Sequence, residues 1–124
     1  MVLVDTSVWI RFLAGREPFA SGLDALLDRD EVLAHDLVEG ELLIGDKAGR
    51  PALLTDYARM LRLPALSHGE VLAFVRARKL NGRGIGWVDA QVLASAVATR
   101  TSLWTADEKL AALAAELRVA HTPS

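Results

Sequence analysis

Four acidic side chains of the sequence occupy positions from which carboxylates can do chemistry. Asp5 directly follows the apolar run Val2-Leu3-Val4, and Asp107 closely follows another short apolar run. Glu41 and Asp89 lie inside two segments whose apolar residues have helical spacing. Carboxylate oxygens select hard cations such as Mg²⁺ and Mn²⁺. If these four side chains meet, the sequence predicts a divalent-metal site.

An acid at the start of a helix has a simpler explanation, because it can cap the helix or complement its dipole. Helical phase, at about 100° per residue, separates the two cases. Counted from Leu37, Glu41 falls at about 40°, on the apolar side with Val38 and Ile44. We therefore expect Glu41 to face the core, and Glu39, on the opposite side, to face water and cap the helix.

The same test applies to the other two helical acids. Asp89 is bracketed by Val92 and its apolar neighbours, so it is expected to face inward from the first turn of its helix. Asp107 borders the apolar stripe that begins at Leu110, whereas Glu108 lies on the wet side. We expect Asp107 to belong to the site and Glu108 to cap the helix.

Inward carboxylates need a compensating charge, and no Lys or Arg shares the inward faces of Glu41 or Asp89. Two carboxylates about 4 Å apart repel by roughly 4 kcal/mol at an effective dielectric constant of 20. A divalent cation would supply the compensation. The alternative is that the acids lie apart, each capped or protonated.

Composition describes a chain that can build its own core. Its 124 residues suit one domain spanning 1–124, and 52% of them are hydrophobic while 24% are charged. The absence of cysteine excludes a disulfide framework, a thiolate metal site and a cysteine nucleophile. No apolar run is long enough for a membrane helix and no secretory signal is evident. We expect a soluble, cytoplasmic protein without a membrane partner.

Short apolar runs alternate with helical segments. We expect buried strands at 2–4, 32–34 and 102–104, a closing edge strand at Val119–Ala120, and helices at about 6–15, 19–27, 36–45, 51–61, 67–79, 87–99 and 105–117. Strands without polar alternation, separated by helices, indicate a small parallel sheet covered on both faces. The fold class is α/β, and the site belongs at the carboxyl ends of the strands.

Capping pairs mark three of the helix starts. They are Asp36 with Glu39, Ser67 with Glu70, and Thr105 with Glu108. The three tryptophans, Trp9, Trp87 and Trp104, lie in apolar surroundings and are expected in the core. The histidines His35, His68 and His121 have no metal-ligand spacing, so we expect surface or capping roles for them.

Positive charge is local rather than general. The net charge is −2, from 14 basic and 16 acidic residues, which excludes a generally basic nucleic-acid coat. Residues 71–88 nevertheless contain no acid, and they carry Arg76, Arg78, Lys79 and Arg83. This patch would contact phosphates of a nucleic acid, or it is simply a solvated helix end and loop.

Four segments together resemble a known family. They are Val2-Leu3-Val4-Asp5-Thr6-Ser7-Val8-Trp9-Ile10, Glu41-Leu42-Leu43-Ile44-Gly45, Gly86-Trp87-Val88-Asp89-Ala90 and Leu103-Trp104-Thr105-Ala106-Asp107. Their order and spacing are similar to the four blocks of PIN domains, and most similar to the VapC-type toxins of bacterial type II toxin–antitoxin systems. The resemblance covers essentially the whole chain.

The resemblance implies a three-layer α/β/α sandwich and a Mg²⁺- or Mn²⁺-dependent endoribonuclease. The acids of the family fall on Asp5, Glu41, Asp89 and Asp107, as metal ligands and catalytic groups, and its supporting hydroxyls fall on Thr6 and Thr105. The implied partners are an RNA substrate, a second copy in a homodimer, and a cognate antitoxin whose tail occupies the groove over the metal site. The segment 53–61 would serve such an interface, or it packs in the core.

Other functions remain open at this point. A PIN-like nuclease of RNA processing, outside any toxin–antitoxin system, would carry the same acids. A non-catalytic PIN-like binding module has no physical reason to keep them. A phospho-signalling domain with Asp5 as acceptor would need an acidic pair after the first strand and a lysine after a late one, and the sequence has neither.

Overall fold

The computed structural model describes residues 1–46 and 50–123. Strands β1 (Val2–Val4), β2 (Val32–Leu33) and β3 (Ser102–Trp104) form a parallel sheet in the order β2-β1-β3. Leu3 of the central strand is in register with Leu33 on one side and Leu103 on the other. All three side chains of β1 are buried, as expected for a central parallel strand that is covered on both faces.

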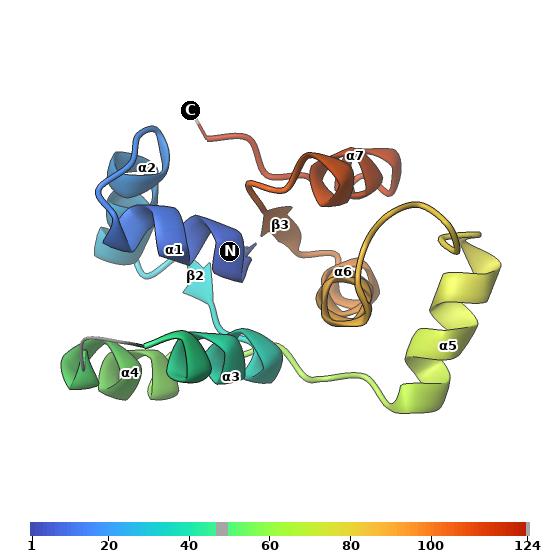
Figure 1. Ribbon diagram of the computed structural model, residues 1–124, viewed down its shortest axis with the longest axis horizontal. Helices are drawn as coiled ribbons and strands as arrows, with labels where there is room; N and C mark the ends of the chain where they lie inside the picture. Colours follow the sequence, from blue (N-terminus) through green and yellow to red (C-terminus); the bar gives the residue numbers. More distant parts are fainter. Residues whose placement is uncertain (47–49, 124) are drawn as a thin grey trace.

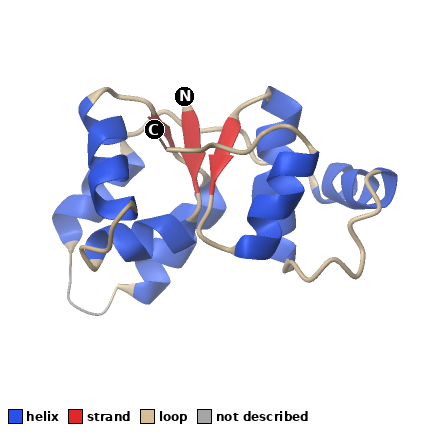
Figure 2. Ribbon diagram, turned by 90° about the horizontal axis from the view of Figure 1, so that it is seen from above, coloured by secondary structure: helices blue, strands red, loops and turns tan. Residues whose placement is uncertain are grey.

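Helices cover both faces of this sheet, which confirms the predicted three-layer α/β/α architecture (Figures 1 and 2). The helices in the described residues are α1 (Thr6–Leu13), α2 (Phe19–Asp28), α3 (Asp36–Gly45), α4 (Pro51–Ala58), α5 (His68–Ala77), α6 (Trp87–Thr99) and α7 (Glu108–Glu116). Helices α1 to α4 lie on one side of the strands and α5 to α7 on the other. No helix in the described part of the chain could cross a membrane.

Two expected elements end differently from the prediction. Helix α4 stops at Ala58 rather than near Leu61, because the chain there extends to pair with the end of β2: the backbone N–H of Ala34 donates to the Leu61 carbonyl at 2.8 Å. The expected edge strand at Val119–Ala120 is reduced to an isolated bridge between Ala120 and Leu103.

Of the three predicted helix caps, the one at α5 is confirmed, and the one at the start of α3 is wrong. The capping box of Ser67 and Glu70 is present. At α3, however, the ring of His35 accepts the hydrogen bond from the backbone N–H of Leu37. Asp36 and Glu39 instead bind the guanidinium of Arg62. Sequence did not indicate this because Arg62 reaches α3 only through the bridge between Arg62 and Ala34.

A buried polar cluster fixes the end of β2 against both helical layers. The ring of His35, which is fully buried rather than on the surface, lies 3.0 Å from the hydroxyl of Ser95 in α6. The hydroxyl of Tyr57 in α4 accepts from the backbone N–H of His35 at 3.0 Å. Burial lowers the pKa of His35 and raises the pKa of Tyr57 to about 12. Both groups therefore stay neutral, and their hydrogen bonds hold α3, and Glu41 with it, in place.

Candidate active site

The carboxyl ends of the three parallel strands meet at one edge of the sheet. Asp5 follows β1 and Thr105 follows β3. The backbone N–H of Asp5 donates to the carbonyl of Trp104 at 2.9 Å, which continues the ladder one residue past the strands. Because β1 has a parallel neighbour on each side, this edge is the place where open α/β sheets form a crevice.

The carboxylate of Asp5 is buried, with 5% of the residue exposed. Asp5 stands at the N-cap of α1, yet its side chain makes no capping hydrogen bond. Its Oδ2 instead accepts from the hydroxyls of Ser7 at 2.6 Å and Thr105 at 2.9 Å. No described residue donates to Oδ1. Helix capping therefore does not explain Asp5, and one of its oxygens is left for a ligand.

Ser7 is a site residue that the sequence reading missed. Its hydroxyl lies 3.2 Å from that of Thr105 and accepts the backbone N–H of Ala106 at 2.9 Å, in addition to its bond to Asp5. A serine two residues after an N-cap aspartate is within reach of that carboxylate, and this spacing was the available signal. Ser7 and Thr105 together set the orientation of Asp5.

Glu41 reaches the edge from α3, but it does not face the core as predicted. The residue is exposed, and its Oε1 accepts from the hydroxyl of Thr6 at 2.6 Å. The buried face of α3 is formed by Val38 and Leu42, while Ile44 is 89% exposed. The prediction placed the buried face a quarter turn away, because α3 presents its other apolar edge to solvent.

Asp89 lies in the first turn of α6, on the opposite side of the edge, and is partly buried. Burial raises its pKa to about 6, together with the carboxylates of Asp5, Asp107 and Glu41, in that order. A hydrogen bond from the backbone of Gly86 opposes the shift. Three acids from other elements therefore lie within electrostatic reach of Asp89.

Asp107 also serves as the N-cap of α7. The residue is exposed, and its Oδ1 accepts from the backbone N–H of Leu110 at 2.9 Å, which caps α7. The expectation that Thr105 and Glu108 form the cap is therefore wrong. Thr105 instead accepts the backbone N–H of Asp107 at 3.1 Å, which links the cap directly to the group that holds Asp5.

The donor set suits a hard divalent cation that keeps part of its water shell. Within residues 1–46 and 50–123, no three His, Cys, Asp or Glu side chains gather closely enough to form a metal cage. Mg²⁺ does not require a cage, because it is usually held through one or two carboxylates and several waters. The open oxygen of Asp5 and the crowded carboxylate of Asp89 are the pair best suited to hold it.

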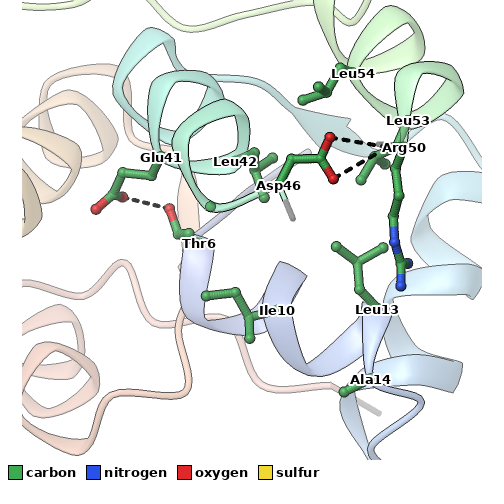
Figure 3. A pocket seen from close by; sticks show the side chains of 11 residues that line it. Thr6, Ile10, Leu13, Ala14, Glu41, Leu42, Asp46, Arg50, Leu53 and Leu54 are labelled. Atoms are coloured by element: carbon green, nitrogen blue, oxygen red, sulfur yellow. Dashed lines mark hydrogen bonds between the residues drawn. The ribbon is translucent and has the colours of Figure 1, made fainter. Parts of the chain in front are cut away.

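An apolar pocket of about 490 Å³ adjoins the acidic edge (Figure 3). Thr6 and Glu41 form one end of its lining, and Ile10, Leu13 and Leu53 are among its apolar residues. The pocket thus continues from Glu41 across α1, α3 and α4, and its lining includes apolar side chains from all three helices.

The residues of the predicted basic patch do not share one environment, and one of the three tryptophans is not in the core. Arg83 forms an ion pair with Glu116 at 2.7 Å, whereas Arg78 lines a separate cleft beside β3. Trp9 and Trp104 are buried, as predicted, but Trp87 is 42% exposed. Its ring packs edge-on against that of His68 at the start of α6.

Comparison with known proteins identifies the family of this chain. The family model of the PIN domain matches residues 2–116. The chain is also 43% identical, over 121 residues, to the protein named Ribonuclease VapC32 in Mycobacterium tuberculosis strains CDC 1551 / Oshkosh and ATCC 25618 / H37Rv. Each match covers 97% of this chain and 95% of the relative. The chain belongs to the PIN-domain family, as a protein of the VapC type.

Proposed function

We propose that this protein is the endoribonuclease toxin of a toxin–antitoxin system and that it cleaves RNA with Mg²⁺ or Mn²⁺. The ribonuclease activity follows from the PIN-domain match and the VapC-type relatives. The metal dependence is supported by one observation above all. Asp5 is buried and does not cap its helix, and its carboxylate joins burial and two further acids in raising the pKa of Asp89.

Each carboxylate has a defined part in this proposal. Asp5 and Asp89 would hold the cation, and Glu41 and Asp107 would add negative charge to the site. The hydroxyls of Ser7 and Thr105 fix Oδ2 of Asp5, so that Oδ1 faces the ligand. The bond from Thr6 to Glu41 holds that side chain at the mouth of the pocket.

A bound Mg²⁺ or Mn²⁺ supplies Lewis acidity toward the scissile phosphate and lowers the pKa of a coordinated water. The protein orients that chemistry, because its carboxylates come from three helices and one strand end that are fixed by the sheet. A carboxylate of this group with water in reach can accept the proton of the attacking water.

Cleavage of RNA by single carboxamide variants tests the proposal. We expect Asp5→Asn and Asp89→Asn to abolish cleavage with Mg²⁺ or Mn²⁺ and to abolish growth arrest on expression. Asp24→Asn is the matched control, because Asp24 is exposed on α2 and does not line the apolar pocket beside the carboxylates. Full cleavage by both site variants would overturn the mechanism. RNA binding without cleavage by the wild type would favour a non-catalytic module.

Neutralisation by an antitoxin is the second part of the proposal. The apolar pocket between α1, α3 and α4 suits a hydrophobic segment of a partner chain, since Ile10 in its lining is 58% exposed and Leu43 and Ile44 of α3 are also exposed. A segment bound there would end beside Glu41, over the acids. We expect coexpression with the neighbouring gene product to restore growth. Growth arrest that no genomic neighbour relieves would favour an RNA-processing nuclease.

Self-association into a homodimer belongs to the same proposal, and the VapC-type resemblance supports it. Analytical ultracentrifugation of the full chain is the direct test. We expect the mass of two copies, and a concentration-independent mass of one copy would contradict this part.

A further inference from the structure

A second cleft, of about 560 Å³, lies at the edge of the sheet opposite the carboxylates. Ser102, the first residue of β3, lines it, whereas the acidic edge begins beyond Trp104 at the other end of that strand. Three residues of strand span about 10 Å. The cleft is therefore separate from the site described above.

Arginines dominate the polar lining of this cleft. They are Arg78, Arg100 and Arg118, and all three are exposed. No carboxylate of the described residues lines the cleft, and none forms an ion pair with these arginines. In a protein with more acidic than basic residues, this is a concentrated positive surface.

The three arginines lie at the carboxyl ends of three different helices, and all three line the cleft. Arg78 ends α5, Arg100 ends α6, and Arg118 follows the end of α7. These helices lie on the same side of the sheet (Figure 1). The arginines are 22 and 18 residues apart along the chain, as their numbers show, so only the fold brings them together.

The backbone at these helix ends favours residues other than arginine. Lys79, Arg100 and Arg118 have φ values of 54°, 53° and 63°. The left-handed region is normally occupied by Gly or Asn after a helix. After α1 and α2, the residues in this left-handed conformation are Gly15 and Asp30. Two of these three basic residues, Arg100 and Arg118, line the cleft.

We propose that this cleft is a second RNA-binding site, which takes the phosphate backbone of the substrate away from the cleaved bond. The inference rests on the proposed ribonuclease function. Arginine is suited to phosphate because its planar guanidinium donates two parallel hydrogen bonds, and Thr101 and Ser102 add hydroxyl donors to the lining. A substrate that reaches both sites must extend well beyond the nucleotides at the carboxylates.

The test compares long and short RNA on the double variant Arg100→Asn/Arg118→Asn. Asn adopts the left-handed backbone more readily than Arg, so the variant keeps the fold. Binding of a fluorescein-labelled single-stranded RNA of 30 nucleotides, and of one of 6 nucleotides, is measured by anisotropy in EDTA at several salt concentrations. The control is Arg16→Asn, because Arg16 is exposed and lines neither pocket.

We expect the double variant to bind the 30-mer at least tenfold more weakly, and to bind the 6-mer more weakly as well, because without metal the carboxylates repel RNA and the arginines of the cleft are its main contacts. Loss of two phosphate contacts should also lower the salt slope for the 30-mer by about 1.4. Unchanged binding of the 30-mer would mean that the arginines only complement helix dipoles, and it would overturn the proposal. An equal loss in Arg16→Asn would also overturn it. Wild-type protein that neither binds nor cleaves RNA would contradict the ribonuclease function instead.

Discussion

Asp89→Asn should stabilise the metal-free protein while it removes activity. Burial and three carboxylates raise the pKa of Asp89 from 3.8 to about 6, so the folded state disfavours its ionised form. A shift of about 2 units corresponds to about 3 kcal/mol at 1.36 kcal/mol per unit. Solvent screens part of this repulsion because the side chain is only partly buried. We therefore expect a gain of about 1–2 kcal/mol at pH 8. Asparagine can still accept the hydrogen bond from Gly86.

The pH dependence identifies the cause of that gain. Below about pH 4 the carboxyl of Asp89 is protonated in the folded and unfolded states alike, so the variant has no advantage. Between pH 4 and 6 the folded state retains a proton that the unfolded state has lost, and wild-type stability falls as the pH rises. Above about pH 6 both states are ionised, and the advantage of the variant is complete and constant.

Urea denaturation in EDTA at pH 4 and pH 8 measures this difference, with Asp24→Asn as the control. Addition of Mg²⁺ at pH 8 should reverse the order, because a ligand at one hundred times its Kd stabilises the wild type by about 2.7 kcal/mol. A variant that is no more stable than the wild type at pH 8 would refute the reasoning. So would an advantage of equal size at both pH values.

Three further predictions concern separate parts of the molecule. Thr105→Val should lower cleavage at least tenfold with the fold retained on circular dichroism, because Asp5 loses one of two orienting hydrogen bonds; unchanged cleavage would remove Thr105 from the site. Ile10→Asp should leave growth arrest intact but abolish rescue by the antitoxin, and retained rescue would place the antitoxin elsewhere. The unfolding free energy of the wild type should fall as the pH is lowered below 6.5, because burial lowers the pKa of His35 and its protonation favours the unfolded state. His35→Asn should make this fall less steep in urea titrations, and an equally steep fall in the variant would contradict the reasoning.

Local chemistry made most of the elements predictable. A buried apolar triplet followed by an aspartate and two hydroxyl residues marks the end of β1 and the start of α1, and glycine at position 15 ends that helix with a φ of 71°. The Ser67–Glu70 capping box marks α5 in the same way. These signals depend on neighbours within four residues, so a single sequence contains them.

Contacts between segments that are distant along the chain could not be predicted from these local signals. The phase of α3 was misjudged because periodicity reports two apolar edges and does not say which one meets α1 and α4; Leu42 is buried and Ile44 is 89% exposed. The capping role expected of the histidines is confirmed for His35. The assignment of the α3 cap to Asp36 and Glu39 was wrong for a related reason, since Arg62 occupies both acids. Such choices depend on tertiary packing.

The candidate site lies between these two cases. The parallel sheet brings the ends of β1 and β3 together, so a meeting of Asp5 with Thr105 follows from the topology. The positions of Glu41 and Asp89 depend on how α3 and α6 pack, and periodicity alone could not determine the packing of either helix. Ser7 was overlooked because a serine after an N-cap is ordinarily part of helix initiation.

Direct titration of Mn²⁺ into the metal-free full chain, followed by calorimetry, tests most directly whether the carboxylates of separate segments bind one cation. We predict saturable binding to the wild type and to Asp24→Asn, and none to Asp5→Asn. Equal binding to all three proteins, or no binding to the wild type, would contradict the account.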